Sequence, residues 1–258
     1  MTSSYIKALP RYSVMIVSLA VLLTVWWLFS LRLPERLLPG PIAVFSTAWN
    51  ITASGEFLTQ AVKTVSRVLL GFCCASVLSS VLGIAMGMNK YIEAYAEPYV
   101  LAGLTIPAIC WAAISIIWFR LTEFAAVFTI TVLVAPMMTV GVVQAMRAME
   151  KDFADMAKAF RVSKPRQVLH LFLPQLLPHF LGSARYGLAL SWKVVVIIEM
   201  MGLTSGIGYK ISFWYGLFSM KHVLAWTLSF TVCMFIIEVF VFKVAERKLL
   251  RWRVDPGV

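Results

Sequence analysis

The chain has 258 residues, of which 60% are hydrophobic and 14% charged, and its net charge is +11. A mean hydropathy of +0.84 excludes a soluble domain, because a chain of this length cannot bury so much apolar surface in its own core. In a soluble protein the positive charge would suggest a nucleic-acid partner. Here the basic residues lie mainly between and beside apolar blocks, so we predict that they orient the chain in a membrane and that it binds no nucleic acid.

The apolar residues come in blocks of about 20, the length that crosses a bilayer as a helix. The blocks show no strand-like alternation, so we predict an all-α polytopic membrane protein with about six transmembrane helices surrounded by membrane lipid. The first block is too long for the core of a cleaved signal peptide, and we expect it to remain as an anchor. The predicted spans cover residues 14–31, 65–88, 98–119, 124–146, 180–203 and 223–244.

Three of the segments between the first and last spans carry their own expectations. Residues 42–58 form a modestly amphipathic stretch at the outer interface or on a neighbouring helix, and residues 89–97 read as a short polar connection. Pro107 lies inside the third span and should kink or interrupt it. Residues 204–221 form an outer loop with room for a short helix.

The distribution of Lys and Arg predicts the orientation. Six spans place both termini, the connection around Lys90 and the long loop after the fourth span on one side, and that side holds most of the basic residues. We therefore expect both termini and the long loop to be cytoplasmic.

The sequence contains no motif for catalysis or for a metal. It has no Gly-rich phosphate-binding loop and no His-Glu-x-x-His pair. Its three histidines, His170, His179 and His222, lie too far apart along the predicted topology to share a metal ion. We predict no catalytic residue, no metal and no cofactor.

The long polar loop is the most informative stretch. From Asp155 it runs Asp-Met-Ala-Lys-Ala-Phe-Arg-Val-Ser to Ser163, and Leu173-Pro174 follows. Acidic residues favour a helix start, alanines make a slim helix, and Ser163 can cap a second helix that Leu173-Pro174 would end. Two short helices joined by a turn would fit a groove on another protein, although an ordinary amphipathic surface loop gives the same pattern.

The same residues resemble the cytoplasmic EAA loop of ABC importer permeases. Asp155 stands at the acid, Met156 and Ala157 at the two alanines, Arg161 at the glycine and Leu173-Pro174 at the end of the motif. Further stretches are similar to the nitrate/sulfonate/taurine branch: Leu38-Pro39-Gly40-Pro41, residues 67–72, Ile106-Pro107, residues 192–200, Gly206-Ile207-Gly208-Tyr209 and residues 246–252.

The resemblance implies an organisation and a set of partners. The fold would be that of a type I ABC importer permease, with an N-terminal anchor helix and outer amphipathic segment (1–60), a permease domain (61–248, coupling loop about 150–174) and a basic cytoplasmic tail (249–258). The partners would be ATP-binding cassette ATPase subunits, a periplasmic or lipid-anchored substrate-binding protein and a second permease copy, as a homodimer, in a bacterial inner membrane. ATP hydrolysis would belong to the separate ATPase subunit, so the chain itself would not be an enzyme.

The loop departs from the family pattern at three points: the acid is Asp155 rather than Glu, Met156 stands at the first alanine, and Arg161 stands at the glycine. Glycine suits a left-handed break between helices, and an arginine in that conformation costs about 1 kcal/mol. Either the turn differs in this chain or Arg161 contacts the partner. The coupling residues are Asp155, Ala157, Phe160, Arg161, Val162, Ser163, Leu173 and Pro174.

Ionisable and aromatic side chains inside the spans are candidates for a substrate pathway. Charges at membrane depth cost at least about 2.5 kcal/mol and usually mark a pathway or a buried pair. Lys193 and Glu199 are six residues apart in the fifth block, so they do not share a helix face. Alternatives are snorkelling for the lysine, a helix-to-helix hydrogen bond for Glu199, and interface anchoring for the other two candidates, Trp192 and Trp111.

The resemblance implies import of a small anion, such as an alkanesulfonate, taurine or nitrate, by alternating access. A vitamin-precursor heterocycle is an alternative substrate, and a non-transporting membrane scaffold is an alternative function. An ion channel would need a polar pore helix or a filter-like loop at mid-membrane, and the sequence shows neither.

Overall fold

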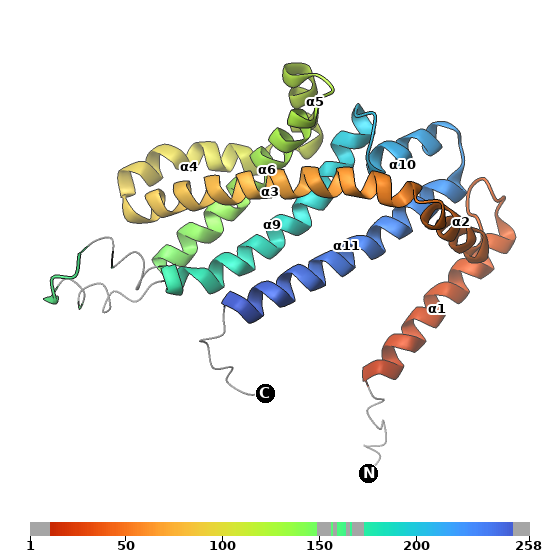
Figure 1. Cartoon of the computed structure of the whole chain (residues 1–258), viewed down its shortest axis with the longest axis horizontal. Coiled ribbons are helices and arrows are strands. Elements are labelled where there is room, and N and C mark those ends of the chain that lie inside the picture. Colours follow the sequence, from red (N-terminus) through yellow and green to blue (C-terminus); the bar gives the residue numbers. More distant parts are fainter. Residues whose placement is uncertain (1–10, 149–155, 157–158, 164–165, 167–172, 250–258) are drawn as a thin grey trace, which may run out of the picture. The chain divides into compact units, whose positions relative to one another are not determined.

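The computed structural model describes residues 11–148, 156, 159–163, 166 and 173–249, which are helical or lie in short connections between helices. This confirms the predicted all-α class. The helices, in chain order, are α1 (Arg11–Arg32), α2 (Pro41–Ala53), α3 (Glu56–Met88), α4 (Lys90–Thr105), α5 (Ala108–Phe119), α6 (Glu123–Arg147), α9 (Leu173–Met201), α10 (Ile207–Gly216) and α11 (Met220–Leu249) (Figure 1).

Five of these helices, α1, α3, α6, α9 and α11, are long and apolar enough to cross a membrane. The pair α4 and α5 qualifies as a sixth span if the two count together, although they are bent by 99° (Figure 1). The bend lies where Pro107 was expected to interrupt the span. Ile106 is in an extended conformation, as residues before proline usually are, and Pro107 is the N-cap residue of α5.

Three element boundaries differ from those expected. Residues 90–97 are helical rather than a polar connection, because the Asn89 side chain caps α4 by accepting a hydrogen bond from the Tyr91 N–H (2.9 Å). The second span was expected to begin at residue 65, and α3 begins earlier, at Glu56. Leu173 and Pro174 begin α9, two turns earlier than the predicted span, and proline is tolerated in this first turn because its missing N–H would have no helical partner.

The chain divides into two compact units, Met1–Leu58 with Lys210–Ser229, and Thr59–Tyr209 with Phe230–Val258. In the first unit α1 packs on α2. The indole N–H of Trp26 donates to the Pro39 carbonyl (3.1 Å) and its ring lies 6.4 Å from that of Phe45. These contacts hold the turn-rich segment between the two helices.

The second unit is built around α6, which packs against α4, α5 and α9. One face of α3 also approaches α6 closely through small residues. A Cβ added to Gly83 would lie 2.6 Å from the Cβ of Val142, and one added to Gly87 would lie 2.5 Å from that of Met146. The small residues of α3 therefore form a helix-packing face, as their four-residue spacing indicates.

The helices of the second unit have two distinguishable ends. At the loop end, where α6 ends and α9 begins, Met86 of α3 and Val143 of α6 share a core with two α4 residues. At the far end, where α6 begins and α9 ends, Ala126 and Ile198 share a core with Ala112 of α5. The bent pair α4–α5 thus runs from the loop end to the far end.

Candidate functional site

The predicted coupling loop lies only partly within the described residues. Asp155 and Ala157 fall outside them, as does most of the expected second helix. Phe160 is 77% exposed, and Arg161, Val162 and Ser163 are exposed beside it. Leu173 and Pro174 belong to α9 rather than to the end of a loop helix.

The backbone at Arg161 has the shape that the family glycine would favour. The N–H of Phe160 donates to the carbonyl of Met156 (3.0 Å), which closes a helical turn, and Arg161 follows with a φ of 50°. This is the left-handed region, where an arginine costs about 1 kcal/mol relative to glycine. The sequence allowed two alternatives: a differently shaped turn, or a contact between Arg161 and the partner. The structure shows the turn that glycine would favour, so the first alternative does not hold.

The best-defined polar site of the described residues is at the far end, and we call it the Arg67 cluster. It consists of Arg67 and Thr64 on α3, Glu123 at the start of α6, Glu199 in the last turn of α9, and the segment 205–208, which runs from the turn after α9 into the start of α10. Arg67 is 2% exposed and Glu199 is fully buried, whereas the Glu123 side chain is 69% exposed.

All five N–H donors of the Arg67 guanidinium have acceptors. Nε and Nη2 donate to the two carboxylate oxygens of Glu123 at 2.5 and 2.7 Å, the bidentate geometry that makes arginine–carboxylate pairs strong. Nη1 donates to Glu199 Oε1 (2.6 Å) and to the Ser205 carbonyl (2.7 Å), and Nη2 donates to Ser205 Oγ (2.8 Å). One side chain of α3 therefore joins α6, α9 and the turn after α9.

The Glu199 carboxylate is surrounded by donors. Besides Arg67, the Thr64 hydroxyl lies 2.9 and 3.0 Å from its two oxygens, and the Gly208 N–H donates to Oε2 (2.8 Å). Thr64 Oγ1 in turn accepts from the Ile207 N–H (2.9 Å). A buried carboxylate needs this degree of pairing, because an unpaired charge at that depth is strongly destabilising.

Gly206 and Gly208 lie where a larger residue would clash with α9. Gly206 has a φ of 107°, and a Cβ at that position would fall 2.3 Å from the carboxylate carbon of Glu199. A Cβ on Gly208 would lie 2.6 Å from the carbonyl oxygen of Val196. The Gly-Ile-Gly motif thus lets the backbone approach the carboxylate closely, so that the Gly208 N–H can donate to it.

Sequence reasoning missed Arg67 and Glu123 as members of a site. Arg67 was noted only as part of a family-like run, and Glu123 was not singled out. A signal was available: an arginine close to the start of an apolar span requires an acidic partner, and Glu199 was an unexplained acid in another span.

The four predicted pathway residues lie in different environments. Lys193 is exposed, whereas Trp192 is fully buried and lies 6.1 Å, ring to ring, from Phe230. Glu199 is held by the Arg67 cluster. Trp111 is half-buried, and its indole N–H and that of Trp192 have no hydrogen-bond partner among the described residues.

Lys193 lies on the exposed face of α9. Exposed residues recur along it at helical spacing: His179, Gly182, Tyr186, Lys193 and Met200. Arg185 lies beside this face, 3.4 Å from Glu238 of α11. The face therefore presents ionisable side chains, His179 and Lys193, among apolar residues, and a charged group is unusual on a membrane-spanning helix in contact with lipid.

No metal site accompanies these residues. Within the described part of the chain, no group of three or more His, Cys, Asp and Glu side chains is placed to hold a metal ion.

Comparison with known proteins agrees with this architecture. Residues 77–251 match the family described as binding-protein-dependent transport system inner membrane component. The chain is 26% identical to a Bacillus subtilis protein named as an aliphatic sulfonates transport permease, SsuC, over 91% of this chain and 85% of that protein. It is 24% identical to the taurine transport system permease protein TauC of Escherichia coli, over 91% and 88% of the two chains.

Two further likenesses extend the comparison. The nitrate import permease protein NrtB of Synechococcus elongatus is 25% identical over 76% of this chain and 74% of that protein. A chain of the MetNI methionine ABC transporter, in an inward facing conformation, has a TM-score of 0.66 and 16% identity over 75% of this chain and 95% of that chain. The sequence-based prediction of family and fold is confirmed: the chain is a multi-pass inner-membrane protein of the binding-protein-dependent transport system inner membrane components, and it is the permease component of an ABC importer.

Proposed function

We propose that this permease imports a small anion by alternating access, with the exposed face of α9 as one wall of the pathway. The proposal rests on the exposure of Lys193 and other polar groups along this face of a membrane-spanning helix. A charge facing lipid would be costly, whereas a charge facing a water-filled pathway would attract an anion.

The relatives support an anionic substrate. Their names specify aliphatic sulfonates, nitrate and taurine, which share a compact, negatively charged oxoanion group. Lys193 is suited to such a group, since its ammonium is a compact point charge on a flexible stem.

The exposed face of α9 is also an argument that two copies of the permease form the pathway. A pathway needs a wall on each side, and one chain exposes this polar face without covering it with its own described helices. A homodimer would place two such faces opposite each other and would remove both from lipid.

The loop between α6 and α9 would connect the permease to the separate ATPase subunits. Its exposed turn at Phe160, Arg161 and Val162 offers side chains to a partner, and the next helix of the described chain is α9, which begins at Leu173. Movement of the loop would therefore be passed to the helix that carries Lys193. Lys and Arg are in excess on the side of the membrane that holds the loop and both termini, which supports a cytoplasmic location for all three. The binding protein would deliver substrate at the far end.

The test is substrate uptake by the reconstituted importer in liposomes. Lys193→Met should reduce the rate of taurine, alkanesulfonate or nitrate uptake about tenfold or more, because a lost charge contact in a partly desolvated pathway is worth a few kcal/mol. The matched control, Lys90→Met, removes an exposed lysine at the start of α4 and should leave uptake unchanged. Equal uptake by both variants would contradict the assignment of Lys193 to the pathway.

A further inference from the structure

We infer that Arg67 is a positioning residue for transport: through Glu123, Glu199 and Ser205 it keeps the far ends of α3, α6 and α9 together while their loop ends move apart or together. This inference rests on the permease being driven through its loop, but it does not depend on which substrate is carried.

At the far end, polar contacts hold α3, α6 and α9 together and restrict their relative movement. The Arg67 guanidinium uses every donor, and its acceptors come from the first residue of α6, the last turn of α9 and the turn that follows α9. Charge-assisted and bidentate hydrogen bonds are both strong and directional. In a medium of low polarity, separating such groups without replacement partners would be costly.

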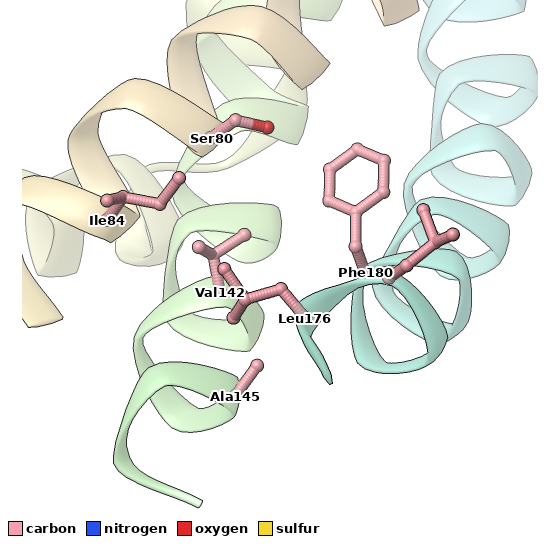
Figure 2. Close-up of a pocket in the computed structure, with 7 residues that line it drawn as sticks. Ser80, Ile84, Val142, Ala145, Leu176 and Phe180 are labelled. Carbon is pink, nitrogen blue, oxygen red and sulfur yellow. The ribbon is translucent and has the colours of Figure 1, made fainter. Parts of the chain in front are cut away.

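The loop end of the same three helices is packed differently. A cavity of about 200 Å³ opens there between α3, α6 and α9, and its wall is apolar. Figure 2 shows side chains from all three helices around it: Ser80 and Ile84 of α3, Val142 and Ala145 of α6, and Leu176 and Phe180 of α9. Apolar contacts are non-directional, so these side chains can slide and repack at smaller cost than the Arg67 cluster can break.

The first turn of α9 is also weakly tied to the rest of its helix. Pro178 lies inside α9, between the cavity residues Leu177 and Phe180, and it has no N–H to donate to the preceding turn. Prolines at such positions are common sites of helix bending. The cavity and this bend therefore give the loop end of α9 room to shift against α3 and α6.

The two ends together define a lever. The stretch from Leu173 to Glu199 is about 39 Å long at 1.5 Å per residue. With Glu199 fixed by Arg67 and Leu173 attached to the loop, a small rotation about the far end gives the largest movement at the loop end. The exposed face of α9 lies between the two, so this rotation would widen or narrow the pathway.

The experiment measures distances at both ends in the assembled importer, with its ATPase and binding protein, in lipid nanodiscs. The native cysteines, three of which are exposed, are first replaced by serine or alanine. Spin labels at Val62 and Met201 report on the far end of α3 and α9, and labels at Val81 and Gln175 report on the loop end of the same helices. Each pair is measured without nucleotide and with ATP plus vanadate.

We expect the loop-end distance to change by about 5 Å or more and the far-end distance by less than about 2 Å. A far-end change as large as the loop-end change, or a loop-end distance that ATP does not alter, would overturn the inference. The distance measurement requires ATP but no identified substrate. Its outcome is therefore independent of the anion-uptake assay, and either proposal can be contradicted without the other.

A second measurement separates positioning from simple stabilisation. Glu123→Gln keeps the shape of an exposed side chain and should fold, yet it weakens the bidentate pair. We expect it to raise the number of ATP molecules hydrolysed per substrate imported at least twofold and to broaden the far-end distance distribution. Glu97→Gln, an exposed glutamate on α4, is the control and should change neither quantity. A role limited to stability would lower the yield of folded importer and leave the ATP-to-substrate ratio unchanged.

Discussion

The guanidinium of Arg67 on α3 lies 2.6 Å from the carboxylate of Glu199 on α9, and both side chains are buried inside helices that can span a membrane. Charges at this depth persist only when each neutralises and hydrogen-bonds the other. The pair therefore joins two helices through residues that are 132 positions apart in the sequence.

Removing one partner of this pair should destabilise the protein strongly. We expect Arg67→Met to lower the free energy of unfolding by about 3–5 kcal/mol, because it leaves the buried Glu199 carboxylate without a counter-charge. Glu199→Leu should lower it by less, because Arg67 keeps its bidentate pair with Glu123. Thermal unfolding of the purified protein in detergent measures this. The double variant should lose clearly less than the sum of the two single losses, since neither charge is then left alone. Additive losses would show that Arg67 and Glu199 do not depend on each other.

Gly206 should tolerate no side chain. Gly206→Ala forces a Cβ into the Glu199 carboxylate and strains a backbone at φ 107°, so we expect a loss of about 2–4 kcal/mol. The matched control is Gly216→Ala at the end of α10, where a Cβ meets no atom within 4 Å. That variant should change stability by less than about 0.5 kcal/mol. Similar unfolding temperatures for both would contradict the geometry of the Gly-Ile-Gly turn.

The close approach of α3 to α6 makes a separate prediction at Gly83. Gly83→Ala places a Cβ 2.6 Å from that of Val142 and should cost about 1–3 kcal/mol through overpacking. Gly182→Ala in α9 adds the same methyl group where no atom lies within 4 Å, and it should be neutral or stabilising by up to about 1 kcal/mol. Unfolding curves of the two variants, recorded side by side, test the packing face of α3.

The left-handed turn at Arg161 makes the opposite prediction. Arg161→Gly should stabilise the turn by about 1 kcal/mol, because glycine adopts a φ of 50° without steric cost. If the arginine only occupies the turn, the affinity for the ATPase subunit should stay the same or rise. A tenfold or greater loss of affinity, measured by titrating the ATPase onto the permease in nanodiscs, would identify Arg161 as a contact.

The sequence predicts the helices well because their signals are local. Apolar blocks of membrane length, the break at Pro107 and the small-residue face of α3 can each be read from neighbouring residues. The errors lie at the ends of helices, where a single capping side chain such as Asn89 turns a polar connection into the first turn of α4.

The Arg67 cluster could be predicted only in part, because its members are brought together by tertiary structure. Glu199 was recognised as a buried acid, but its partner lies in another span and no spacing along the chain connects them. The need for glycine at position 206 could not be predicted either, because it depends on where the Glu199 carboxylate lies in the folded chain. Lys193 and Glu199 were correctly expected on different faces of one helix, which follows from the helical repeat alone.

The most direct test of the proposed mechanism is ATP-driven uptake by the complete importer in liposomes, with the wild-type chain and with Asp155→Lys or deletion of residues 162–164. The wild-type importer should accumulate taurine, an alkanesulfonate or nitrate only when both ATP and the loaded binding protein are present. Both loop variants should insert and fold normally, yet lose at least 90% of this uptake. Undiminished uptake by both variants would contradict the claim that the loop between α6 and α9 couples ATP hydrolysis to transport.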